Sequence, residues 1–165
     1  MKARLAGLLI VVLTAVALTI PQEPASAALR WQGLLLSRDG RNWTPDLQLP
    51  LFEQDVVLVP GTEQLRTFYV RNQSRGAARL SVTVLVSNSH GLLERSGFTM
   101  GVRTGRGRYH RIRRTGGHKV AHLRMARGKM VPVTVRVLLR PRAGNKTMDG
   151  LYQFVVRVRL TGKRK

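Results

Sequence analysis

One stretch of the chain concentrates side chains that bind anions. Its six arginines fall within twelve residues: Arg103, Arg106, Arg108, Arg111, Arg113 and Arg114. A guanidinium group is always charged and presents paired N–H donors that match the oxygens of a phosphate or a carboxylate. Glycines among these arginines allow the backbone to follow an irregular ligand, and Tyr109 and His110 stand in the middle of the stretch. The segment therefore predicts a binding site for a polyanion.

The residues that serve metal sites and catalysis lack the partners that such sites need. His118 and His122 are four residues apart, which on a strand separates them by about 13 Å, too far to share one metal ion. The chain has no cysteine, no Gly-x-Ser-x-Gly elbow and no His-Glu-x-x-His motif, and its acidic residues are scattered. We therefore expect no metal, no cofactor and no catalytic residue, and we predict that the protein is not an enzyme.

The whole chain has a formal net charge of +21. Most of this positive charge is concentrated in its second half. Between residues 28 and 94 seven basic residues face six acidic ones, whereas from residue 95 to the end twenty face one. Phosphate contacts supply affinity without base information, so we expect binding to an anionic polymer but no sequence-specific nucleic-acid recognition. A second interpretation stays open, in which the arginines reflect compositional bias and form a solvated surface.

The first 27 residues are typical of a cleavable secretory signal. Two basic residues precede an uncharged apolar run at 5–20, two prolines end this run, and small residues follow. The residues at the predicted cleavage site are Ala25, Ala27 and Ala28. The apolar run is shorter than the roughly 20 residues that span a bilayer as a helix. We therefore predict a secreted or cell-surface protein whose mature part, residues 28–165, is one domain without a transmembrane segment.

Alternation of apolar and polar residues predicts the elements that position these groups. It is strict in three segments, 80–86, 131–139 and 152–160, and weaker in five others, 29–36, 55–59, 64–72, 98–103 and 118–126. In the last of these the alternation places Ala121, Leu123 and Met125 on the buried side and Val120, His122 and Arg124 on the other. Two long loops, 37–54 and 104–117, interrupt the strands. Without helical periodicity between strands, the pattern predicts an all-β fold: an antiparallel immunoglobulin-like β-sandwich of about seven to nine strands, preceded by the signal-peptide helix.

Short motifs support a family resemblance. A Pro60-Gly61 turn leads into a strand that ends in Val70-Arg71-Asn72, and a second strand follows at 80–86. This arrangement resembles bacterial secreted immunoglobulin-like modules. The wider layout, with Trp31, Asp39-Gly40, Trp43, the segment 50–53 and a final Gly-x-Tyr-x-Phe strand at 150–154, is similar to small actinobacterial exported proteins related to the TasA/camelysin group. The resemblance implies a secreted β-sandwich and, for the fibre-forming relatives, a structural role in an extracellular matrix. Camelysin-type proteins have been assigned protease activity, but this chain carries no matching metal motif.

Two functions remain open at this point. The first is an exported, non-enzymatic module at the cell surface or in the extracellular matrix, whose basic half holds an acidic wall polymer, anionic lipid headgroups or extracellular DNA. The second is a structural subunit or assembly factor of an extracellular fibre, which would self-associate by β-strand pairing at its sheet edges.

Overall fold

The computed structural model describes residues 33–47, 50–52, 58–88, 93, 97–143 and 152–162. Within these residues the chain forms eight strands and no helix. The strands are β1 (Leu34–Ser37), β2 (Glu63–Asn72), β3 (Ala78–Asn88), β4 (Phe98–Thr104), β5 (His110–Ile112), β6 (Gly116–Met125), β7 (Met130–Leu139) and β8 (Gln153–Gly162). The predicted signal segment with its cleavage site, Trp31 and most of the predicted strand 55–59 lie outside the described residues. A search of the described part for a helix that could cross a bilayer finds none.

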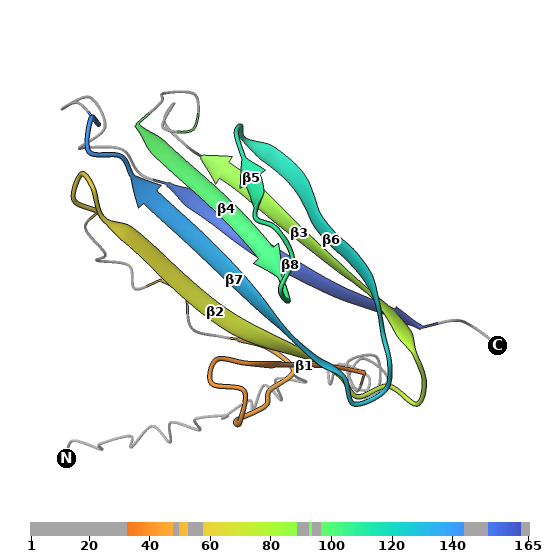
Figure 1. Ribbon diagram of the computed structural model, residues 1–165. Helices are drawn as coiled ribbons and strands as arrows, with labels where there is room; N and C mark the ends of the chain where they lie inside the picture. Colours follow the sequence, from red (N-terminus) through yellow and green to blue (C-terminus); the bar gives the residue numbers. More distant parts are fainter. Residues whose placement is uncertain are drawn as a thin grey trace, which may run out of the picture.

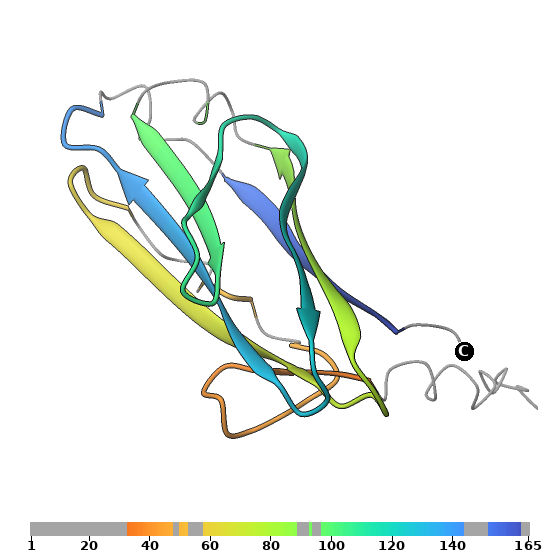
Figure 2. The ribbon, with the colours of Figure 1, turned by 45° about the vertical axis from the view of Figure 1, so that its right-hand side comes forward.

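The strands form two antiparallel sheets, which are the two layers visible in Figures 1 and 2. The larger sheet has the order β1-β2-β7-β4-β5, and the smaller sheet has the order β6-β3-β8. This confirms the prediction of an all-β antiparallel fold, and eight strands lie within the predicted range. Both sheets pair strands from distant parts of the sequence, for example β2 with β7 and β3 with β8.

The inward face of each strand contributes to one shared core. Alternate residues of β3, from Leu80 to Val86, are at most 3% exposed, and those of β7, from Val131 to Leu139, are at most 7% exposed. Strand β8 completes the core with half-buried residues such as Phe154 and Val158. Because both sheets bury their inner faces on this core, their outer faces point in opposite directions. The alternation in the sequence thus decides which side chains each outer face displays.

The predicted loop at 104–117 is wrong in part, because it contains the short strand β5. Ile112 is 1% exposed and joins the core, opposite Met100 on β4. His110, which the sequence places in a loop, is the first residue of this strand. Ile112 is the single aliphatic residue of the stretch, and a strand of three residues is too short to show alternation.

A β-bulge shifts the alternation of β6. The register between β3 and β6 changes between Val82 and Thr83, so that Val82 pairs with Ala121 while Thr83 pairs with Lys119. Val120, which lies between these partners, packs against the core together with Ala121 and Leu123. The prediction that Val120 faces outward is therefore wrong, because the extra residue of a bulge turns its neighbour to the other face.

Asn72 ties two chain reversals together. Its fully buried Nδ2 group donates to the carbonyls of Gly76 and Met125, both at 3.0 Å, and of Ala126 at 3.2 Å. Its Oδ1 atom accepts hydrogen bonds from the backbone N–H and the hydroxyl of Ser74, at 2.9 and 2.6 Å. One side chain thereby links the turn from β2 to β3 with the end of β6, which belongs to the same sheet as β3.

Asp39 organises the turn that follows β1. Its carboxylate accepts hydrogen bonds from the backbone N–H groups of Asn42 and Arg41 and from the hydroxyl of Ser37, each at 2.8 Å. These bonds, the one from the Asn42 backbone first, hold the pKa of the Asp39 carboxyl well below its ordinary value. The turn returns the chain so that Leu36 and Thr44 exchange backbone hydrogen bonds.

Candidate anion-binding site

Tyr109 is the centre of a cationic cluster on the outer face of the larger sheet. Its ring covers Gly101, where a Cβ atom would lie only 3.3 Å from Tyr109 Cδ1. The guanidinium carbons of Arg103 and Arg136 lie 4.9 and 5.5 Å from the centre of the same ring. Stacking on a ring uses the face of a guanidinium and leaves the N–H donors in its plane for an anion. We name Arg103, Tyr109 and Arg136 the tyrosine cluster.

Polar atoms in and beside the tyrosine cluster lack ordinary partners. The buried Nε of Arg103 and the buried hydroxyl of Thr99 have no hydrogen-bond partner in the described part of the chain. The Nε of Arg136 lies 2.9 Å from Glu63 Oε1, but it does not form a hydrogen bond of good geometry, so this contact is chiefly an ion pair. A buried donor without a partner costs free energy.

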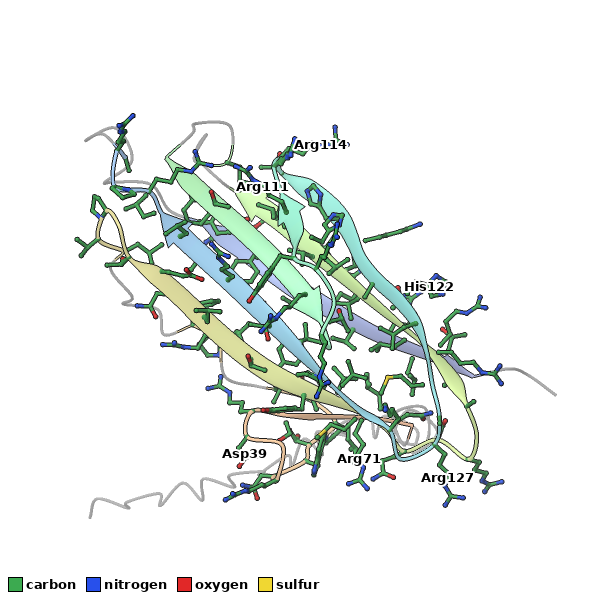
Figure 3. All side chains as sticks on the ribbon, viewed as in Figure 1. Asp39, Arg71, Arg111, Arg114, His122 and Arg127 are labelled. Carbon is green, nitrogen blue, oxygen red and sulfur yellow. The ribbon has the colours of Figure 1, made fainter. Side chains whose placement is uncertain are left out.

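The other five predicted arginines lie on β5 and in the turns on either side of it. Arg111 pairs with Gly101 across the β4–β5 ladder and is exposed beside the tyrosine cluster. Arg106 and Arg108 are exposed in the turn before β5, and Arg113 and Arg114 are exposed in the turn after it. Figure 3 shows Arg111 and Arg114 near one end of the sheets and Arg71 and Arg127 near the opposite end. We name Arg106, Arg108, Arg111, Arg113 and Arg114 the arginine loop.

The structure brings together residues that the sequence does not connect. Arg136 on β7 is the member of the tyrosine cluster that lies outside the predicted site. Its outward position follows from the alternation of β7, but its place opposite Gly101 depends on the register between β7 and β4. Gly101 has no side chain and so leaves the flat surface on which the ring of Tyr109 lies.

The described histidines occupy separate positions. His118 and His122 lie on β6, and the Nε2 atom of His118 donates a hydrogen bond of 2.8 Å to the carbonyl of Arg114. This bond places a proton on Nε2 and fastens the end of the arginine loop to β6. Within the described ranges, no group of three or more histidine and carboxylate side chains comes close enough to hold a metal ion.

Comparison with known proteins gives distant structural likeness alone. No family model and no curated protein matches the chain. A solved structure described as "AvmM Catalyzes Macrocyclization in Alchivemycin A Biosynthesis" is similar over 72% of this chain and 87% of its own, with 14% identity and a TM-score of 0.32.

This likeness corrects one prediction from the sequence. The protein to which the chain is similar is a catalyst, so the prediction that this chain is not an enzyme is contradicted, and we withdraw it. A TM-score of 0.32 carries no argument about what reaction, substrate or site this chain would have. The proposals below rest on the chain's own residues.

Proposed function

We propose that the protein is an exported immunoglobulin-like β-sandwich module of the cell surface or extracellular matrix, and that it binds an anionic polymer through the arginine loop and the tyrosine cluster. The observation that carries the proposal is the ring of Tyr109 with two guanidinium groups stacked on it, beside a buried Arg103 Nε that has no hydrogen-bond partner among the described residues. Two antiparallel sheets on one core, the Pro60-Gly61 turn and the buried Asn72 support the immunoglobulin-like assignment.

Charge balance supports the same function. The acidic residues within the described ranges are Asp39, Asp46 and Glu63. Asp39 is engaged in its own turn, and Glu63 is paired with Arg136. The exposed arginines of the loop therefore lack carboxylate partners in this part of the chain. An anionic polymer supplies the missing charges, and its bound counterions are released when it binds.

The test compares two variants that each lose four positive charges. The loop variant replaces Arg106, Arg108, Arg113 and Arg114 with glutamine, and the control variant replaces the exposed Arg41, Arg75, Arg127 and Arg142 with glutamine. Retention on a column of immobilised polyphosphate is measured at increasing salt. We expect the loop variant to elute at clearly lower salt than the control variant, although both have the same net charge. Equal elution of the two variants would show that the loop is a solvated surface without a binding role.

Assembly into a fibre through strand pairing is a second proposal, favoured by the long edge strands. β6 and β8 are the edges of the smaller sheet, and within the described residues neither has a further strand beside it. The bulge in β6 hinders regular pairing, so β8 is the edge that such assembly would use. Light scattering at rising protein concentration, without any anion, tests this proposal. Growth of oligomers that Val155→Lys on β8 abolishes would support it, and a protein that stays monomeric would contradict it.

A further inference from the structure

The outer face of the smaller sheet carries an ordered set of cations. Three successive rows cross β6, β3 and β8, and their members are given by the strand register: Arg124, Arg79 and Thr161; His122, Ser81 and Arg159; Lys119, Thr83 and Arg157. The basic side chains in these rows are exposed. Rows lie about 7 Å apart along the strands, and strands lie about 4.8 Å apart across the sheet. We name the nine residues of these rows the cationic sheet face.

The arrangement of the cationic sheet face is unfavourable for the protein alone. Arg79 and Arg124 pair directly across the ladder, where like charges destabilise a sheet. None of the acidic residues within the described ranges lies on β3, β6 or β8. Five permanent cations thus share a surface three strands wide without a carboxylate from these strands to balance them. This face is separated from the tyrosine cluster by the core, since the two sheets point their outer faces in opposite directions.

We infer that the cationic sheet face is a second anion-binding surface and that its ligand is a linear phosphodiester polymer without bases, of the poly(glycerol phosphate) type. Each of the three rows holds at least one arginine, so a chain with one charge per repeat finds a cation at every step. Ser81 and Thr83 on the central strand place hydroxyl groups between the flanking cations, where they can donate to phosphate oxygens.

The composition of this face favours a polymer without bases over a nucleic acid. Binding of single-stranded nucleic acid relies on aromatic side chains on which bases stack. None of the nine residues is Phe, Tyr or Trp, whereas the larger sheet displays Tyr109 on its outer face. A flat surface of guanidinium, ammonium and hydroxyl groups contacts the phosphates of a flexible chain and offers no stacking surface to a base.

A face variant, matched in charge to the loop and control variants, tests this inference. It replaces Arg79, Arg124, Arg157 and Arg159 with glutamine, and its binding to fluorescent poly(glycerol phosphate) is measured by anisotropy between 50 and 200 mM salt. Loss of four phosphate contacts lowers the slope of log affinity against log salt by about 3, at roughly 0.7 per contact. We expect this change in the face variant, with an affinity loss of about tenfold or more, and a slope in the control variant close to that of the unaltered protein.

Oligo-dT with the same number of phosphates serves as the second probe. We expect the face variant to lose much less affinity for oligo-dT than for poly(glycerol phosphate). An equal loss for both probes would overturn the assignment of a ligand without bases. A face variant that binds poly(glycerol phosphate) like the control variant would overturn the site itself.

Two controls keep the outcome interpretable. The four substitutions are at exposed positions and remove repulsion, so the fold should persist; circular dichroism checks this. If the face variant does not fold, the pair Arg157→Gln and Arg159→Gln on β8 should give half of the slope change. The inference does not depend on the arginine loop, because the loop variant and the face variant change different residues and we expect each to lower binding without the other. A loop variant without effect would contradict the proposed function and leave the cationic sheet face standing.

Discussion

Replacement of Asn72 by alanine tests whether one buried amide joins the chain reversals on which the two sheets depend. The side chain is 0% exposed, and its Nδ2 group serves three carbonyl oxygens, those of Gly76, Met125 and Ala126. Alanine has no donor for these carbonyls and no acceptor for the two bonds from Ser74. Because a buried polar group without a partner is costly, the substitution should lower the free energy of unfolding by more than the loss of an ordinary hydrogen bond does.

The expected loss of unfolding free energy depends on how deeply each hydrogen bond of Asn72 is buried. The bond to the Met125 carbonyl is fully buried, so its loss should cost about 1–3 kcal/mol. The bonds to Gly76 and Ala126 are partly buried, and water can replace them in the variant, which adds about 1 kcal/mol. We therefore expect Asn72→Ala to lower the free energy of unfolding by about 2–4 kcal/mol, a large part of the 5–15 kcal/mol of a typical domain.

Equilibrium unfolding in urea, followed by far-ultraviolet circular dichroism, measures this loss. Ser74→Ala is the control, because it removes the hydroxyl bonds to Asn72 and Gly76 but leaves the Asn72 amide bonded to all three carbonyls. The control should lose about 1 kcal/mol or less. If Asn72→Ala lost no more than Ser74→Ala, the buried amide would not be the link that the structure indicates.

Three further predictions concern the tyrosine cluster, the turn that Asp39 organises after β1, and the cationic sheet face. Tyr109→Ala removes two cation–π contacts and should cost about 1–2 kcal/mol in urea unfolding, whereas Tyr109→Phe should cost less than half of that. The pKa of the Asp39 carboxyl is lowered in the folded state, so the ionised carboxylate stabilises the fold fully at neutral pH and less as the pH falls below about 4. Thermal melts from pH 7 to 2 should therefore show a smaller loss of stability in acid for Asp39→Asn than for the unaltered protein. Arg124→Gln removes the like-charge pair with Arg79 and should raise the unfolding midpoint at low salt, by an amount that shrinks as salt is added; a lower midpoint at low salt would contradict this.

Strict alternation is the part of the fold that the sequence predicts well. The segment 131–139 forms β7, and each of its five alternate apolar residues is buried. The same holds for Phe68 and Val70 in β2 and for Phe98, Met100 and Val102 in β4. A strand with one buried face must alternate, so a local pattern is enough to place it.

Features that depend on register are the part that local patterns miss. The bulge that turns Val120 inward is defined by the partner strand, and β5 is recognised by its pairing with β4 rather than by its own three residues. The cationic sheet face has the same origin. Arg79, Arg124 and Arg159 are far apart in sequence, and only the order β6-β3-β8 makes them neighbours.

The candidate anion-binding site is predicted from the sequence only in part. The composition of the segment 103–114 alone predicts an anion-binding site, and the five arginines of the arginine loop are exposed as a binding role requires. The remaining predicted arginine, Arg103, is half-buried against Tyr109, and Arg136 from β7 joins it there because Gly101 leaves room for the ring. No local signal pairs these residues, since their contact follows from the β4–β7 register.

Salt-dependent binding of the loop variant is the most direct test of the proposed function. Binding of the purified protein to an immobilised anionic wall polymer is measured from 50 to 200 mM salt for the unaltered protein, the loop variant and the control variant. The proposal predicts binding that weakens steeply with salt in the unaltered protein and the control variant, and a slope lower by about 3 in the loop variant. Retention that ignores salt, or a loop variant that binds as the control variant does, would contradict it.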